Sequence, residues 1–192
     1  AAGVPIEGLY VDRNGDGTVT PDDMYRYKKA APDATFGFYT GVNLGNFDLS
    51  LGARAMVGNY VYNNNLASQG VYDFVYNSSG GSGGGYLNNV DSQTEALDIN
   101  TPRYFSDHYV QDGSFLRIDH ITAGYDFGNI GSAISSFRLS ITAQNPLLIT
   151  GYDGIDPEIA SRDVTTNSVG FGIDNNIYPR SRTFLLGLNV KF

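Results

Sequence analysis

Hydrophobic and polar residues alternate along five separate stretches of this chain. Within each stretch nearly every second residue is apolar, and the residues between them are mostly small or polar. A period of two places alternate side chains on opposite faces of an extended strand. The alternation therefore predicts five β-strands, at residues 35–45, 47–57, 114–128, 136–147 and 183–192.

The two faces of these predicted strands differ in charge. One face is apolar and holds no charged side chain. The other face carries Asp48, Arg54, Arg117, Asp126, Arg138 and Lys191. In the third stretch the apolar positions change parity between Ile118 and Ile121, so we expect a β-bulge near 119–120 that returns the apolar side chains to one face.

Short and long connections alternate between the strands. The short ones, 45–46 and 128–135, are rich in Gly, Asn and Ser, which favour tight turns. The long ones are 1–34, 58–113 and 149–180. The predicted strands have about 10 residues or more, whereas strands usually have 5–6. Long strands joined alternately by short turns and long loops are typical of transmembrane β-barrels. In these barrels the short turns face the periplasm and the long loops face outside.

We therefore expect an all-β chain of antiparallel barrel strands, with the apolar face toward lipid and the polar face toward a hydrated lumen. Domain 1–34 would then be an extracellular loop, and 35–192 would hold the five strands with extracellular loops at 58–113 and 149–180. A soluble sandwich also alternates. The alternative is a secreted, Ca²⁺-stabilised β-sandwich that binds glycans or mediates adhesion.

Composition narrows the function classes. The 24 Gly, 14 Tyr and 11 Phe with only 17% charged residues fit an all-β chain with long loops. A net charge of −8 argues against a nucleic-acid partner, which needs basic surface. There is no cysteine for a disulfide or a thiol nucleophile. The opening residues Ala1-Ala2-Gly3-Val4-Pro5 resemble mid-protein sequence, so a piece of a longer protein is expected.

Residues 12–23, DRNGDGTVTPDD, fit a calcium-binding loop of the EF-hand type. Oxygen ligands at alternating positions can wrap one hard cation, and Gly17 falls where the sharp turn needs glycine. The expected ligands are Asp12, Asn14, Asp16, the Thr18 carbonyl, Thr20 and Asp23. The last of these is Asp instead of the usual Glu, so its reach is shorter. We expect Ca²⁺ ahead of Mg²⁺.

The same residues admit a purely structural interpretation. Thr20 can cap a short helix, Pro21 suits its first position, and Asp23 can complete a capping box. The two glycines, Gly15 and Gly17, would then only form turns. Both interpretations can hold together.

Long phrases of the sequence resemble the end of SusC/RagA-type TonB-dependent transporters. They are VDRNGDGTVTPDD (11–23), DGSFLRIDHITAGYDF (112–127), RLSITAQNPLLITGYDGIDPEI (138–159) and YPRSRTFLLGLNVKF (178–192). They occur in the order that the family has, and the resemblance covers most of the chain apart from about 60–105.

The resemblance implies that these are the last strands of a barrel in the bacterial outer membrane. That barrel would have about 22 strands, which is within the size range of such barrels. It further implies an N-terminal plug, a SusD-like surface lipoprotein as a lid, and import of glycans or peptides driven by TonB through the missing N-terminal part. In this family pattern Gly187, Val190 and Phe192 would act as an assembly signal.

Signs of catalysis are weak. His108 and His120 lack metal-ligand spacing, and no Gly-x-Ser-x-Gly elbow occurs. The tract 78–85, SSGGSGGG, lacks the Lys-Ser/Thr ending of a phosphate loop and is expected to be a flexible tip. We therefore do not expect this protein to be an enzyme. The loop tyrosines could stack on sugars, contact a protein or form an interfacial girdle; they are Tyr60, Tyr62, Tyr72, Tyr76 and Tyr86.

Overall fold

The fold is described from a computed structural model of the chain. The residues that the structure describes are 10–72, 75–77, 86–87, 90, 99–100, 104, 106–162, 169–175 and 177–192. The chain forms two compact units. The first unit comprises 1–30, 60–111 and 158–177, and the second comprises 31–59, 112–157 and 178–192.

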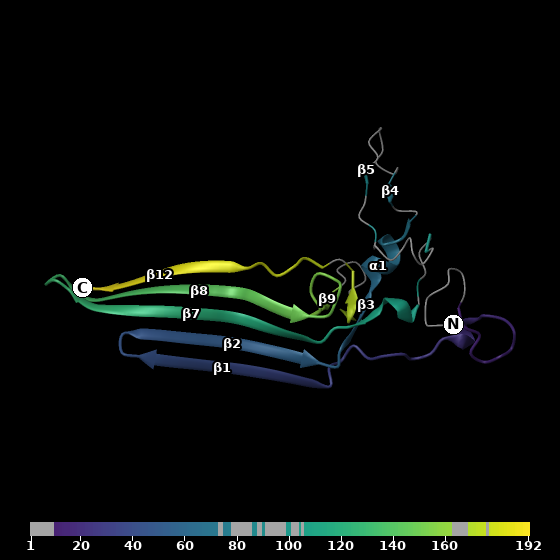
Figure 1. Cartoon of the computed structure of the whole chain (residues 1–192), viewed down its shortest axis with the longest axis horizontal. Coiled ribbons are helices and arrows are strands. Elements are labelled where there is room, and N and C mark those ends of the chain that lie inside the picture. The colour runs from purple at the N-terminus through teal and green to yellow at the C-terminus, as the bar shows by residue number, and fades with distance from the viewer. Residues whose placement is uncertain are drawn as a thin grey trace. The chain divides into compact units, whose positions relative to one another are not determined.

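The second unit is built on one five-stranded sheet (Figure 1). Its strands are β1 (Ala34–Leu44), β2 (Phe47–Val57), β7 (Phe115–Ile130), β8 (Ile134–Thr150) and β12 (Thr183–Lys191). They lie in that order, and each pair of neighbours is antiparallel. The five strands predicted from the alternation are therefore confirmed.

Strands β7 and β8 are longer than the alternation predicted. They reach 16 and 17 residues, and the turn between them shrinks to 131–133 from the predicted 128–135. Gly131 has a φ of 68°, a left-handed conformation that lets the chain reverse within so few residues. At its other end β8 continues to Thr150, so the long connection begins after that residue and not at 149.

The predicted bulge is present. Asp119 is skipped in the pairing of β7 with both of its neighbours, since Ile118 and His120 are the paired residues on either side of it. On β8 the pairing omits 145–146, where Asn145 takes a φ of 49°. The extra residue restores the alternation, so the apolar side chains from Leu116 to Tyr125 share one face, while the buried Phe115 lies beside Arg117 on the other.

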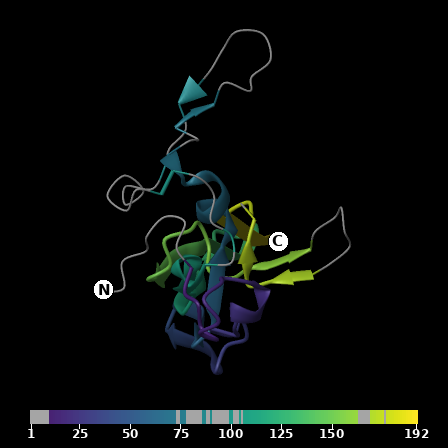
Figure 2. The ribbon, with the colours of Figure 1, turned by 90° about the vertical axis from the view of Figure 1, so that its right-hand side faces the viewer.

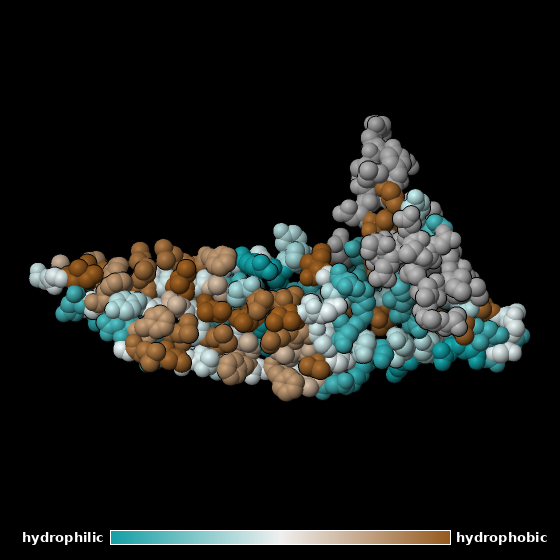
Figure 3. Space-filling view, viewed as in Figure 1, coloured by the Kyte–Doolittle hydropathy of each residue, from teal (hydrophilic) through white to brown (hydrophobic). Residues whose placement is uncertain are grey.

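Among the described residues, many large apolar side chains on one face of the sheet are exposed (Figure 3). Phe36, Phe184 and Leu186 expose 59%, 71% and 71% of their surface, respectively. Apolar patches of this extent are unfavourable in water and mark contact with a membrane or a partner. The exposure therefore agrees with the lipid-facing side expected from the sequence.

The polar face carries an ion pair that crosses three strands. The Arg138 guanidinium on β8 donates to both carboxylate oxygens of Asp48 on β2, at 3.1 and 2.7 Å. Gly124 of β7 lies directly opposite Asp48 in the register. A side chain there would overlap both charged groups, so the glycine leaves the space in which they meet. The pair ties β2 to β8 across β7.

The first unit is a small folded body with short elements (Figure 2). They are η1 (Pro21–Asp23), β3 (Tyr60–Asn63), α1 (Asn64–Gln69), β4 (Tyr76–Asn77), β5 (Tyr86–Leu87), η3 (Asp107–Tyr109), β6 (Val110–Asp112), β9 (Ala160–Arg162), β10 (Val169–Phe171) and β11 (Ile173–Asp174). Strands β11, β3 and β6 form one sheet, while β4 pairs with β5 and β9 with β10. Among the described residues, no helix has the length and apolar character needed to cross a membrane.

The first unit has its own buried core. The core side chains, each at most 6% exposed, are Val61, Ala67, Val71, Ile99, Tyr109 and Ile159. The side chain of Asn63 caps α1 by accepting a hydrogen bond from the Leu66 amide. Where the structure describes them, the long connections therefore form helices, strands and a buried core.

Substituting Gly124 with alanine should loosen the sheet, because the added methyl group displaces the Asp48–Arg138 pair. Both side chains are about one third exposed, so the loss should be no more than about 1 kcal/mol. The measurement is the unfolding temperature of the full-length barrel, read in detergent gels as the temperature at which the fast-migrating folded band is replaced by the slower unfolded band. Gly37→Ala is the matched control, because a Cβ at Gly37 has no atom within 4 Å. An equal fall for both variants would contradict the role of the ion pair.

Candidate functional site

The loop at 12–23 is held by its own carboxylates. Asp12 accepts hydrogen bonds from the amides of Gly15 and Gly17 at 2.7 and 2.8 Å. Asp16 accepts from the amide and the hydroxyl of Thr18, each at 2.8 Å. Both glycines have positive φ values, 76° and 86°. The tight turns that the sequence predicted are therefore present.

The predicted capping box is also present. Asp23 accepts hydrogen bonds from the amides of Arg13 at 2.7 Å, Asn14 at 3.2 Å and Thr20 at 2.8 Å. The Thr20 hydroxyl accepts from the Asp22 amide at 3.3 Å and so caps η1. Asp23 closes the loop by joining its first residues to its last.

These hydrogen bonds stabilise the charged form of two carboxyl groups. The bonds from the Thr18 amide and hydroxyl lower the pKa of Asp16. The amides of Thr20 and Arg13 lower the pKa of Asp23 in the same way. Both groups are therefore ionised at neutral pH, which is the state that a cation would require.

The six predicted metal ligands thus lie in one loop. Their side chains, however, are arranged to hydrogen-bond within the turn and do not converge on one point. In the part of the chain that the structure describes, no three Asp, Glu or His side chains gather closely enough to hold a metal ion. The Asn14 amide oxygen is engaged in the same turn, since it accepts a hydrogen bond from the Asp16 amide at 2.9 Å. Calcium binding stays a prediction.

The loop is tied to a distant segment of the first unit. The Arg13 guanidinium lies 3.7 Å from the centre of the Tyr25 ring. The Tyr25 hydroxyl donates to Asp107 at 2.8 Å, and this hydrogen bond raises the pKa of Tyr25. Asp107 begins η3, which contributes the buried Tyr109 to the core. The sequence analysis missed this link, because the two residues are 82 positions apart and carry no shared local signal.

The loop tyrosines have different surroundings. Tyr60 and Tyr62 lie on β3 of the first unit and not on the five-stranded sheet. Tyr62 packs edge-on against Tyr109, with ring centres 6.4 Å apart, and Lys28 lies over the Tyr60 ring. Tyr72 is 52% exposed. The side chains of Tyr76 and Tyr86, and the whole tract 78–85, lie outside the described residues.

Three arginines on the polar face of the sheet, Arg54, Arg117 and Arg138, are each paired with a carboxylate. Arg54 and Arg117 face each other across β2 and β7. Each has its own carboxylate: Arg54 lies 3.4 Å from Asp119, and Arg117 contacts Asp156 at 2.6 Å. The Arg117–Asp156 pair is buried, and Arg180 approaches the same carboxylate at 3.9 Å. The neighbouring positive charges are therefore neutralised separately.

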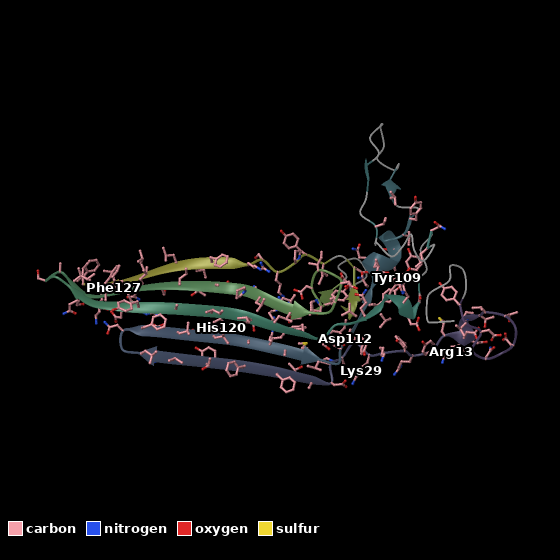
Figure 4. All side chains as sticks on the ribbon, in the orientation of Figure 1. Arg13, Lys29, Tyr109, Asp112, His120 and Phe127 are labelled. Carbon is pink, nitrogen blue, oxygen red and sulfur yellow. The ribbon has the colours of Figure 1, made fainter. Side chains whose placement is uncertain are left out.

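The two histidines lie in different units. His120 lies near the middle of β7 (Figure 4). Its ring lies directly over Gly52 of β2. Tyr39 of β1 approaches the same ring, at 6.0 Å between centres. His108 instead contacts the Tyr109 ring in the first unit. His120 is itself paired, with Gly52 on one side and Gln144 on the other, so it lies on the polar face directly after the bulged Asp119.

Two residues of the expected assembly signal, Gly187 and Val190, lie on β12, and Phe192 directly follows that strand. Gly187 is on the polar face, where its missing side chain makes room for Ser140. Val190 is on the apolar face, and Phe192 is 87% exposed. The contact with Ser140 thus explains the glycine at position 187 without any assembly role. The assembly role of the three residues stays a prediction.

Comparison with known proteins gives the family. No family model matches the chain. TonB-dependent receptor SusC of Bacteroides thetaiotaomicron is 40% identical over 99% of this chain. TonB-dependent receptor P3 of Formosa agariphila is 30% identical over 96%. The chain spans only 18% and 19% of the lengths of these relatives.

A solved structure agrees in fold. The RagAB peptide importer in its "closed-closed" state matches 97% of this chain with a TM-score of 0.66 and 23% identity, while the chain covers 21% of that structure. These proteins are receptors and an importer by name. The match of nearly the whole chain to such proteins weighs against the secreted sandwich. We conclude that the chain belongs to the SusC/RagA-type TonB-dependent receptors of the bacterial outer membrane.

Proposed function

We propose that this chain is part of an outer-membrane importer of glycans or peptides that is powered through TonB and closed by a SusD-like surface lipoprotein. The observation that carries the proposal is the 40% identity to SusC over 99% of the chain. The geometry supports it, because an uncharged apolar face and an ion-paired polar face suit a wall between lipid and a hydrated lumen.

The proposed activity is transport without bond chemistry. The proteins matched by name are receptors and importers. The polar side chains at the described sites are engaged in hydrogen bonds and ion pairs that order strands and turns.

Uptake by the full-length protein tests this function. Cells that carry it with its lipoprotein should accumulate labelled oligosaccharides or peptides, and removal of TonB should abolish the accumulation. The medium should contain no newly released reducing sugar or cleaved peptide. Hydrolysis without uptake would contradict the proposal.

The first unit supplies a surface on which the lipoprotein could dock. Tyr72 is more than half exposed and follows the buried Val71, so a rigid core presents it. Exposed tyrosines on a fixed scaffold are frequent anchors of protein interfaces. We expect Tyr72→Ala to lower the affinity for the lipoprotein about tenfold, measured by co-purification and by titration in detergent.

Deletion of 78–85 is the matched control for that prediction. This Gly-rich tract is expected to be a flexible tip and should be dispensable for docking. Val71 is kept in both variants because its burial makes it part of the core. Undiminished recovery of the lipoprotein with Tyr72→Ala would refute the assignment.

We further propose that the loop at 12–23 binds Ca²⁺, through Asp12, Asn14, Asp16, the Thr18 carbonyl, Thr20 and Asp23. The ionised state of Asp16 and Asp23 and the left-handed turn at Gly17 support the fit. Asp16→Ala should weaken calcium binding about tenfold in calorimetric titrations of the full-length protein, and Asp22→Ala should not. A wild-type protein that takes up no calcium at millimolar concentration would contradict the site.

The terminal strand is proposed as the assembly signal, through Gly187, Val190 and Phe192. Removing Phe192 should lower the amount of barrel in the outer membrane about tenfold, while the barrels that do form keep their stability in detergent. Phe184→Ala is the control, because it removes an exposed phenyl ring from the same strand. Equal outer-membrane levels in both variants would exclude a special role for the last residue.

A further inference from the structure

Tyr39 stands among residues without side chains on the polar face of β1. Its neighbours on that face of the strand are Gly37 and Gly41, and its partner on β2 is Gly52. The Tyr39 ring is 71% exposed. A single aromatic ring therefore rises from a flat patch of backbone.

Two of these glycines have no packing reason within this chain. A Cβ at Gly37 would meet nothing within 4 Å, and one at Gly41 would meet only the Leu49 carbonyl oxygen at 3.9 Å. Neither has a left-handed backbone. Glycine inside a strand costs stability, and it often marks a place where a ligand or another backbone comes close. The open space beside Tyr39 is thus kept at a cost to the strand.

Gly52 has the opposite environment. The His120 imidazole of β7 lies so close above it that any Cβ would overlap the ring. Tyr39 and His120 are the register partners of Gly52 on its two sides. Their ring centres are 6.0 Å apart and the planes meet at 41°. Two rings therefore lie next to each other across three strands, with Gly52 beneath the imidazole.

Charges near the two rings are already matched. Arg54, one row away from Gly52 on β2, pairs with Asp119. On the other side lie the Thr122 and Thr142 hydroxyls, 2.9 Å apart. Gln144 continues the row beyond His120. A neutral ligand with an apolar flat side and several hydroxyl groups suits this surface better than one with bare charges.

From this arrangement we infer that Tyr39 and His120, over Gly52, form a stacking subsite for a pyranose ring of a neutral oligosaccharide on the lumen wall. The inference rests on the proposed importer function and narrows its substrate class. The C–H face of the sugar would lie on the rings, and the glycines would let its hydroxyl groups approach the strand backbone. Tyr39 would then determine specificity without taking part in any chemical step.

The test uses the full-length transporter in detergent with maltohexaose, cellohexaose, xylohexaose and hexaglycine as probes in calorimetric titrations. The wild type should bind at least one of the sugars, and Tyr39→Ala should bind it about tenfold more weakly. Tyr39→Phe should keep the affinity. Gly41→Val should weaken it although the ring is retained, because the new side chain occupies the open space. Asn43→Ala, on the same face of β1, is the matched control.

Two results would overturn the subsite. The first is equal sugar affinity of the wild type and Tyr39→Ala. The second is a wild type that binds none of the sugars, whether or not it binds hexaglycine. In each case uptake in cells would leave the importer function standing, whereas absence of any uptake would count against that function itself.

Discussion

The continuous antiparallel hydrogen-bond ladder from β1 to β12 is the constraint on which the second unit depends. In a bilayer no water is available to unpaired amides and carbonyls, so every strand must satisfy its neighbours. The register runs without a break through β1 and β2 and adjusts only at Asp119 and near the β7–β8 turn. Once this ladder is fixed, alternation alone decides which side chains meet lipid and which meet the lumen.

The polar face shows what that constraint permits. Because side chains cannot leave their register positions, charges must find partners across strands, as Arg138 does with Asp48 over Gly124. The bulge at Asp119 lets one additional carboxylate reach Arg54. Glycine has two different roles on this face. At Gly124 and Gly52 it makes room for a neighbouring side chain, whereas at Gly37 the space stays open.

Local signals explain what the sequence could and could not predict. The five strands, the bulge, the turns and the capping box all follow from patterns within about a dozen residues. The extension of β8 to Thr150 could not be foreseen, since Asn145-Pro146 resembles a strand end and pairing resumes only because β7 lies alongside. The Tyr25–Asp107 and Arg117–Asp156 contacts join residues 82 and 39 positions apart. Such pairs leave no periodicity in the sequence, so the contacts that order the long connections could not be predicted from it.

Gly172 shows why the long connections of the first unit depend on one another. Its amide donates to the Ile159 carbonyl, its own carbonyl accepts from the Tyr62 amide, and a Cβ on it would overlap Ala30. Three segments that are far apart in the chain thus meet at one residue with a φ of 76°. Any larger residue there would strain the backbone and separate the segments. The three segments are therefore held in place by one another at Gly172, and a change in one of them will disturb the other two.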